Sequence, residues 1–127
     1  MRLLIAEGSP ILRKRLTGLF SDLGNISLVA FVQNLADVQQ MALAEKPDVI
    51  VIDIGFPTLA NLSMLAALKD ETKHPQVIVL TETAEPRHIR QFKNSGADMV
   101  FDMKDDLNTF VGHLKILVDG VSKTPVV

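Results

Sequence analysis

The chain has 127 residues, a formal net charge of −2, 47% apolar residues and no cysteine. This length and apolar share are typical of one globular domain and argue against disorder. The lack of cysteine excludes disulfides, Cys-ligated metals and thiol catalysis, and the nearly balanced charge gives no sign of a nucleic-acid partner. No apolar run reaches the ~18–20 residues of a membrane span, and Glu7 interrupts the first run too early for a signal peptide. We therefore expect a cytoplasmic domain with no membrane partner.

Short apolar runs recur along the chain and predict β-strands. The third and fourth runs are unbroken and rich in β-branched residues, which suits strands buried on both faces of a parallel sheet. The predicted strands cover residues 3–6, 27–32, 49–52, 77–80 and 99–101.

The segments between these runs have helical apolar spacing. Ser9-Pro10 suits a helix start, because Ser can cap the first turn and Pro tolerates the first helical position. The predicted helices run from Ser9-Pro10 to Gly24-Asn25, from Asn34 to Lys46-Pro47, from about Leu59 to Glu71, from Glu85-Pro86 to Gly96, and from Leu107 to Val121.

Regular alternation of strand and helix predicts an α/β fold with a parallel sheet covered by helices on both faces. We expect a single domain over residues 1–121 and a C-terminal tail over 122–127. Ligands of such sheets bind outside the carboxyl ends of the strands. The residues that follow each apolar run are therefore the candidates for function.

Acidic side chains stand at three of these strand ends: Glu7, Asp53 and Asp102. Carboxylates that gather at one edge repel each other and imply a cation, a raised pKa or both, and oxygen ligands suit Mg²⁺. Asp53 ends the most apolar strand and is followed by another apolar residue, where an unpaired charge is costly. Thr81 ends the fourth strand and adds a hydroxyl to the same edge.

Several motifs in register resemble the receiver domain of bacterial two-component response regulators, over essentially the whole chain. The resemblance implies a flavodoxin-like (βα)5 three-layer sandwich with a five-stranded sheet in the order 2-1-3-4-5. The matching stretches are residues 4–10, residues 47–53 with Pro57 four residues on, residues 77–81, and Ser95-Gly96-Ala97-Asp98.

The resemblance also implies a function and a set of site residues. In this family a sensor histidine kinase donates a phosphoryl group to the Asp at the end of the third strand, which is Asp53 here. Mg²⁺ is then held by Glu7, Asp53 and the backbone carbonyl of Gly55, and the Thr81 hydroxyl contacts the phosphoryl group. The resemblance implies no organic cofactor and no enzymatic activity.

Three departures from the family pattern fall at this site. Gly8 replaces a second acid that is normally a metal ligand, which weakens Mg²⁺ binding. Met103 replaces a Lys that pairs with the phosphoryl group. Lys104, one residue later, faces the opposite side of the strand unless the loop relaxes that rule. Val100 takes the place of an aromatic switch residue.

Two neighbouring positions also differ from the family. Glu82 follows Thr81 where small residues are common, and Asn61 replaces a customary Gly in the loop after Asp53. All these departures leave two interpretations open. The domain is either a phosphorylated switch with an incomplete site or a degenerate receiver that is not phosphorylated and serves as an interaction module.

Two functions of other classes are weaker alternatives. A flavin-binding electron carrier shares the topology, but it needs a phosphate-binding loop after the first strand, and the loop from Glu7 is short and acidic. A hydrolase needs a base at a strand end, whereas His74, His88 and His113 lie in or beside predicted helices.

The fourth helix, fifth strand and fifth helix form the family's usual output surface. Here the fourth helix carries basic side chains, and acids follow the fifth strand, so a symmetric, charge-paired homodimer is one expectation. We expect no DNA-binding domain after the fifth helix, so the chain is predicted to act through protein–protein contacts. The basic strip consists of Arg87, His88, Arg90 and Lys93.

Overall fold

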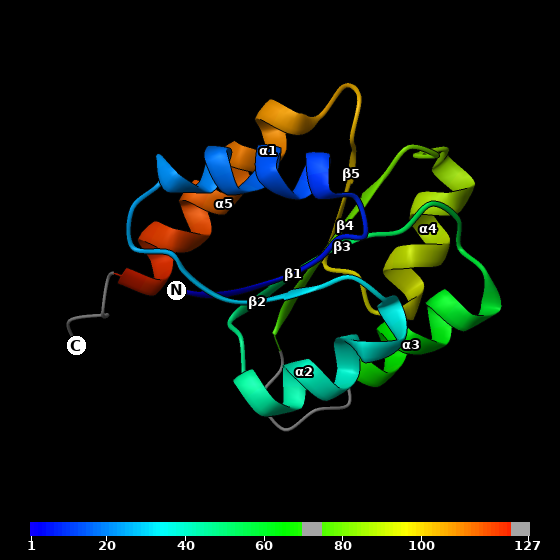
Figure 1. Cartoon of the computed structure of the whole chain (residues 1–127). Coiled ribbons are helices and arrows are strands. Elements are labelled where there is room, and N and C mark those ends of the chain that lie inside the picture. The colour runs from blue at the N-terminus through cyan, green and yellow to red at the C-terminus, as the bar shows by residue number, and fades with distance from the viewer. Residues whose placement is uncertain (70–74, 123–127) are drawn as a thin grey trace, which may run out of the picture.

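The computed structural model describes residues 1–69 and 75–122, and strands alternate with helices throughout (Figure 1). The strands are β1 (Arg2–Ala6), β2 (Ser27–Val32), β3 (Val49–Asp53), β4 (Gln76–Thr81) and β5 (Met99–Asp102). The helices are α1 (Pro10–Ser21), the short 3₁₀ turn η1 (Leu35–Asp37), α2 (Val38–Glu45), α3 (Leu59–Lys69), α4 (Pro86–Ser95) and α5 (Leu107–Ser122).

The strands form one parallel sheet in the order β2-β1-β3-β4-β5. This order confirms the predicted flavodoxin-like α/β fold. It also puts β1, β3 and β4 at the centre of the sheet, where their carboxyl ends lie next to one another.

Alternate residues of each strand enter two separate cores, as the period-two geometry of a strand requires. On β3, Ile50 and Ile52 face one core, while Val49 and Val51 face the other. The helices α2, α3 and α4 close the first core, and α1 and α5 close the second (Figure 1). The unbroken apolar runs of the central strands follow from this burial on both faces.

The helix ends agree with the sequence in some places and differ in others. The Ser9 side chain caps α1 as predicted, because its Oγ accepts a hydrogen bond of 3.3 Å from the N–H of Leu12. However, α1 ends at Ser21 rather than at Gly24-Asn25, because both of those residues have positive φ and form the turn into β2.

The second helix also begins differently from the prediction. Asn34 precedes the 3₁₀ turn η1, not an α-helix, and its side chain makes no capping bond. The α-helix α2 starts only at Val38 and ends at Glu45, and Lys46 caps it in the left-handed conformation. Asn61 lies in the first turn of α3, within the helix predicted from about Leu59, although the resemblance implies a loop position; its Nδ2 donates to the Phe56 carbonyl at 2.8 Å.

The motif Gly96-Ala97-Asp98 has a structural role. Gly96 has φ +132°, and a Cβ there would lie 2.9 Å from the Leu65 carbonyl oxygen, so only glycine fits. Asp98 accepts hydrogen bonds from the Val77 N–H at 2.8 Å and from the Lys69 ammonium at 2.5 Å. The motif therefore joins the end of α3 to the beginning of β4.

Two predicted features fall partly outside the described residues. Glu71 and His74 lie in the stretch 70–74, and most of the predicted tail lies in 123–127. Helix α5 includes Ser122, one residue beyond the predicted domain boundary. Within residues 1–69 and 75–122, no helix is both long and apolar enough to span a bilayer.

Candidate phosphorylation site

The central strands bring three of the predicted site residues to one edge of the sheet. Asp53 is the last residue of β3 and pairs with Leu80, so Thr81 follows it on the adjacent strand β4. Glu7 comes directly after β1, which pairs with β3 on the other side. Their strands converge because parallel strands end at a common edge.

Two carboxyl groups dominate the electrostatics of this edge. Glu7 is only 4% exposed; its Oε1 accepts the Ser9 N–H at 2.9 Å, while its Oε2 is buried with no hydrogen-bond partner among the described residues. Burial, the adjacent Glu7 carboxyl group and then the charge of Glu82 raise the pKa of Asp53 from 3.8 to about 7. Two ionised carboxylates cannot donate to each other, so the pair needs a proton or a cation between them.

A small network of hydroxyl groups lies beside the carboxyl groups. The Thr81 side chain is buried, and its Oγ1 is 3.4 Å from the Gly55 carbonyl oxygen. Thr83 donates its hydroxyl to the same carbonyl at 2.6 Å and donates its N–H to Thr81 Oγ1 at 3.2 Å. The Gly55 carbonyl oxygen therefore lies next to the Thr81 hydroxyl, so both groups belong to the same site.

Gly8 occupies the position of the expected second acid. A Cβ on Gly8 would be 3.3 Å from the Gln33 carbonyl oxygen, and the backbone of Gly8 is not left-handed. A side chain there needs a shift of only a few tenths of an ångström. The φ of Gly8 permits a side chain, and a second acid would fit if the backbone at Gln33 gives way by this amount.

The residues at the predicted lysine position do not bring a cation to the site. Met103 is half-buried against the core beneath α1 and α5, and its N–H donates to the Thr81 carbonyl at 2.9 Å. Lys104 is exposed in the turn after β5, where its N–H donates to Asp102 at 2.8 Å. Neither of the ion pairs found in the described part of the chain involves Lys104.

The aromatic side chains near β5 are not arranged as a switch. Val100 is half-buried and packs against the core under α2, α3 and α4. Phe101 faces the opposite core, is 4% exposed, and contacts the rings of Phe110 and His113 with centroids 5.7 and 5.9 Å away. Position 100 therefore offers no aromatic ring, and the Phe101 ring packs inside the core.

Sequence reasoning missed the role of Thr83, although a pattern was present. Thr81 and Thr83 are two residues apart, the spacing at which extended backbone presents both side chains on one side. Thr83 also accepts a hydrogen bond at its carbonyl from Nδ1 of His88, at 3.0 Å. His88 is buried in the first turn of α4, which no property of the sequence alone indicates.

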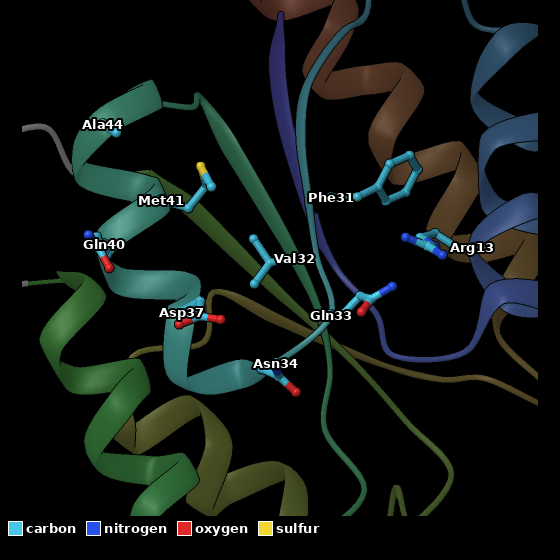
Figure 2. A pocket seen from close by; sticks show the side chains of 9 residues that line it. All are labelled: Arg13, Phe31, Val32, Gln33, Asn34, Asp37, Gln40, Met41 and Ala44. Atoms are coloured by element: carbon cyan, nitrogen blue, oxygen red, sulfur yellow. The ribbon is translucent and has the colours of Figure 1, made fainter.

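A separate cavity of about 550 Å³ lies along the outer edge of β2 (Figure 2). Figure 2 shows Met41 and Gln40 on α2 to one side of the strand and Arg13 of α1 to the other, with Arg13 placed 5.4 Å from the centre of the Phe31 ring. None of its lining residues belongs to the carboxyl and hydroxyl cluster. The cavity is therefore not the site predicted from the sequence.

Comparison with known proteins defines the class. The family model of the response regulator receiver domain matches residues 3–111. The chain belongs to this family and is a receiver domain of two-component response regulators. Receiver domains in general are not enzymes, bind Mg²⁺ at their phosphorylation site, and interact with histidine kinases and other proteins.

Individual relatives are distant but cover the chain well. A nitrate/nitrite response regulator protein homolog of Haemophilus influenzae is 24% identical over 120 residues, covering 94% of this chain and 58% of its own length. The chain spans only about three-fifths of the length of the curated relatives whose matches cover nearly all of it.

Solved receiver structures have the same fold. The receiver domain of the putative response regulator NarL from Mycobacterium tuberculosis has a TM-score of 0.80 at 19% identity, covering 94% of this chain and 96% of its own. The response regulator domain of Thermotoga maritima CheB has a TM-score of 0.76 at 19% identity and covers 98% of both chains.

Proposed function

We propose that Asp53 accepts a phosphoryl group from a phosphohistidine of a sensor histidine kinase. An Asp53 Oδ atom attacks phosphorus, the new O–P bond forms, and the donor's P–N bond breaks and releases neutral imidazole after protonation. The observation that supports this role most is the position of Asp53 beside the buried Glu7, whose Oε2 has no hydrogen-bond partner in the described part of the chain. Two adjacent carboxyl groups need a positive charge to balance them. This arrangement suits a phosphoryl acceptor that works with a bound metal ion.

The donor set fits Mg²⁺, although it is incomplete. The described residues contain no cluster of three acidic or histidine side chains able to hold a metal, so the ligands would be Glu7, Asp53, the Gly55 carbonyl and water. Mg²⁺ accepts one or two carboxylates with several waters. When bound, the ion neutralises negative charge on the phosphoryl oxygens. Because Gly8 adds no charge, we expect a weaker metal site than that of a receiver with two acids here.

The remaining residues orient the phosphoryl group but do not balance its charge. Thr81 can turn its hydroxyl toward a phosphoryl oxygen, because both acceptors near its Oγ1 are distant, the Gly55 carbonyl at 3.4 Å and Thr83 Oγ1 at 3.2 Å. Met103 is half-buried against the core, and Lys104 is exposed in the turn after β5. We therefore expect phosphorylation to be slow, since charge neutralisation drives this reaction.

Incubation with acetyl phosphate and Mg²⁺, followed by intact-mass measurement, tests the proposal. We expect a mass gain of one phosphoryl group that is lost in EDTA and in Asp53→Ala. Asp102→Ala is the matched control, because Asp102 also ends a strand at this edge, and it should keep the gain. Phosphorylation that persists in Asp53→Ala would overturn the assignment.

A second candidate is a receiver that is never phosphorylated and acts only as an interaction module. The arrangement of Met103, Lys104 and Val100 favours it, since no cation and no aromatic switch serves the site. No mass gain in the parent protein, at saturating Mg²⁺ and acetyl phosphate, would support this candidate against the first.

We also propose that the protein is cytoplasmic. Its partner surface, in this proposal, is formed by α4, β5 and α5. Arg87, Arg90 and Lys93 are exposed on α4, Asp105 is exposed after β5, and Ile116 on α5 is 68% exposed. A symmetric homodimer would pair these opposite charges around an apolar centre. Sedimentation at micromolar concentration should detect the dimer, and a monomer with and without beryllofluoride would contradict it.

A further inference from the structure

We propose that Thr83 is a positioning residue that transmits the occupancy of the site to helix α4 through His88. This inference rests on the proposed phosphorylation of Asp53 and deepens it, because it names the route by which the site controls a surface. The route starts from two groups that the reaction itself uses, Thr81 and the Gly55 carbonyl.

The Thr83 hydroxyl connects both of these groups. Its Oγ1 lies 2.6 Å from the Gly55 carbonyl and 3.2 Å from Thr81 Oγ1. A carbonyl oxygen only accepts, so Thr83 donates its single hydroxyl proton to Gly55. Its oxygen then remains free to accept the hydroxyl proton of Thr81, which completes a short donor chain from Thr81 to Gly55.

Occupation of the site competes with this chain at both ends. A phosphoryl oxygen accepts a hydrogen bond more strongly than a neutral hydroxyl does, so it draws the Thr81 proton away from Thr83. A cation on the Gly55 carbonyl draws electron density from the oxygen to which Thr83 donates. Both events weaken the bonds that hold the Thr83 side chain in place.

The backbone of Thr83 carries the change to α4. The Thr83 carbonyl accepts a hydrogen bond from His88 Nδ1 at 3.0 Å, so Nδ1 must carry the proton. His88 is 7% exposed, and this bond satisfies one of its ring nitrogens inside the protein. Movement of Thr83 therefore either breaks a buried hydrogen bond or moves the first turn of α4 with it.

His88 also contacts an aromatic residue at the surface. The ring of Phe56 lies 5.4 Å from the His88 ring, centroid to centroid, and Phe56 is 58% exposed. Phe56 follows Gly55 directly in the loop after β3. The loops that follow β3 and β4 therefore meet at His88, and this contact requires no aromatic residue at Val100.

Nuclear magnetic resonance of the full chain tests the proposal with Mg²⁺ and beryllofluoride as the probe. Bound fluorine signals report binding, and the His88 Nδ1 chemical shift reports the coupling. The variants are Thr83→Val, which keeps the shape but removes the hydroxyl, and Thr83→Ser, which restores it. Thr17→Val is the control, because within residues 1–69 and 75–122 the Thr17 hydroxyl bonds only to the Arg13 carbonyl of its own helix.

We expect beryllofluoride to shift the His88 signal in the parent, in Thr83→Ser and in Thr17→Val, but not in Thr83→Val. Without ligand, amide exchange in the first turn of α4 should be about three- to tenfold faster in Thr83→Val only. If Thr83→Val binds beryllofluoride and its His88 signal still shifts as it does in the parent, the coupling alone is overturned. A parent protein without any bound fluorine signal would overturn the proposed function, and the coupling with it.

Discussion

Replacement of Asp53 by Asn should stabilise the fold at pH 8 and change its stability little at pH 4.5. The pKa of Asp53 is about 7 in the folded chain, against an ordinary value of 3.8. A carboxyl group whose folded pKa is raised binds its proton more tightly in the native state. Stability therefore falls as the pH rises from about 4 to about 7, and the full penalty is present above pH 7.

The size of the penalty follows from the pKa difference. About three pH units correspond to an upper limit of ~4 kcal/mol in the free energy of unfolding. Asp53 is only partly buried, so solvent screening reduces this to about 1–2 kcal/mol. Asn carries no charge at any pH, and its Nδ2 can donate to the unpartnered Oε2 of Glu7.

Urea unfolding of both proteins at pH 8 and pH 4.5, without Mg²⁺, measures this difference. At pH 4.5 the folded parent holds a proton on Asp53 and resembles the Asn variant, so the two midpoints should nearly coincide. Asp105→Asn, at an exposed turn position, should change the free energy by less than about 0.5 kcal/mol at either pH. Equal stability of Asp53→Asn and parent at pH 8, or an equal gain at both pH values, would refute the reasoning.

Three further predictions test neighbouring features. Gly8→Asp should strengthen Mg²⁺ binding about tenfold or more in calorimetry, whereas Gly8→Asn, of the same size, should not. Equal Mg²⁺ affinities of the two variants would contradict the view that this position lacks a negative charge. Gly96→Ala should lower the urea-unfolding free energy by about 2–4 kcal/mol, because the new Cβ would clash with the Leu65 carbonyl and residue 96 has a positive φ. A loss below ~0.5 kcal/mol would contradict this. Glu82→Gln should lower the pKa of Asp53, measured from its carboxyl carbon shift, and an unchanged pKa would show that Glu82 has no effect there.

The sequence predicts the sheet well because burial on both faces leaves a local signal. Residues 49–53 are apolar at every position up to Asp53, and the structure buries Val49 to Ile52 between two layers of helices. The acid that ends such a run is then recognisable as exceptional. The motif Gly96-Ala97-Asp98 is equally local, since only glycine suits the conformation at its first position.

Features that depend on tertiary contacts were not predictable in the same way. Asn61 falls within the predicted helix from Leu59, but its bond to the Phe56 carbonyl, which ties the loop to α3, leaves no signal in the sequence. His88 looks like one member of an exposed basic strip, but the structure buries it against Thr83 and Phe56. Both outcomes arise from where neighbouring loops pass, and no periodicity along the chain records that.

A crystal structure grown with Mg²⁺ and beryllofluoride tests the central claim most directly. We predict the beryllium atom bonded to an Asp53 carboxylate oxygen, the metal in contact with Glu7 and the Gly55 carbonyl, and the Thr81 hydroxyl on a fluorine. Density for neither group at Asp53, under conditions that saturate other receiver domains, would contradict the account. It would leave the chain as a receiver that does not accept phosphoryl groups.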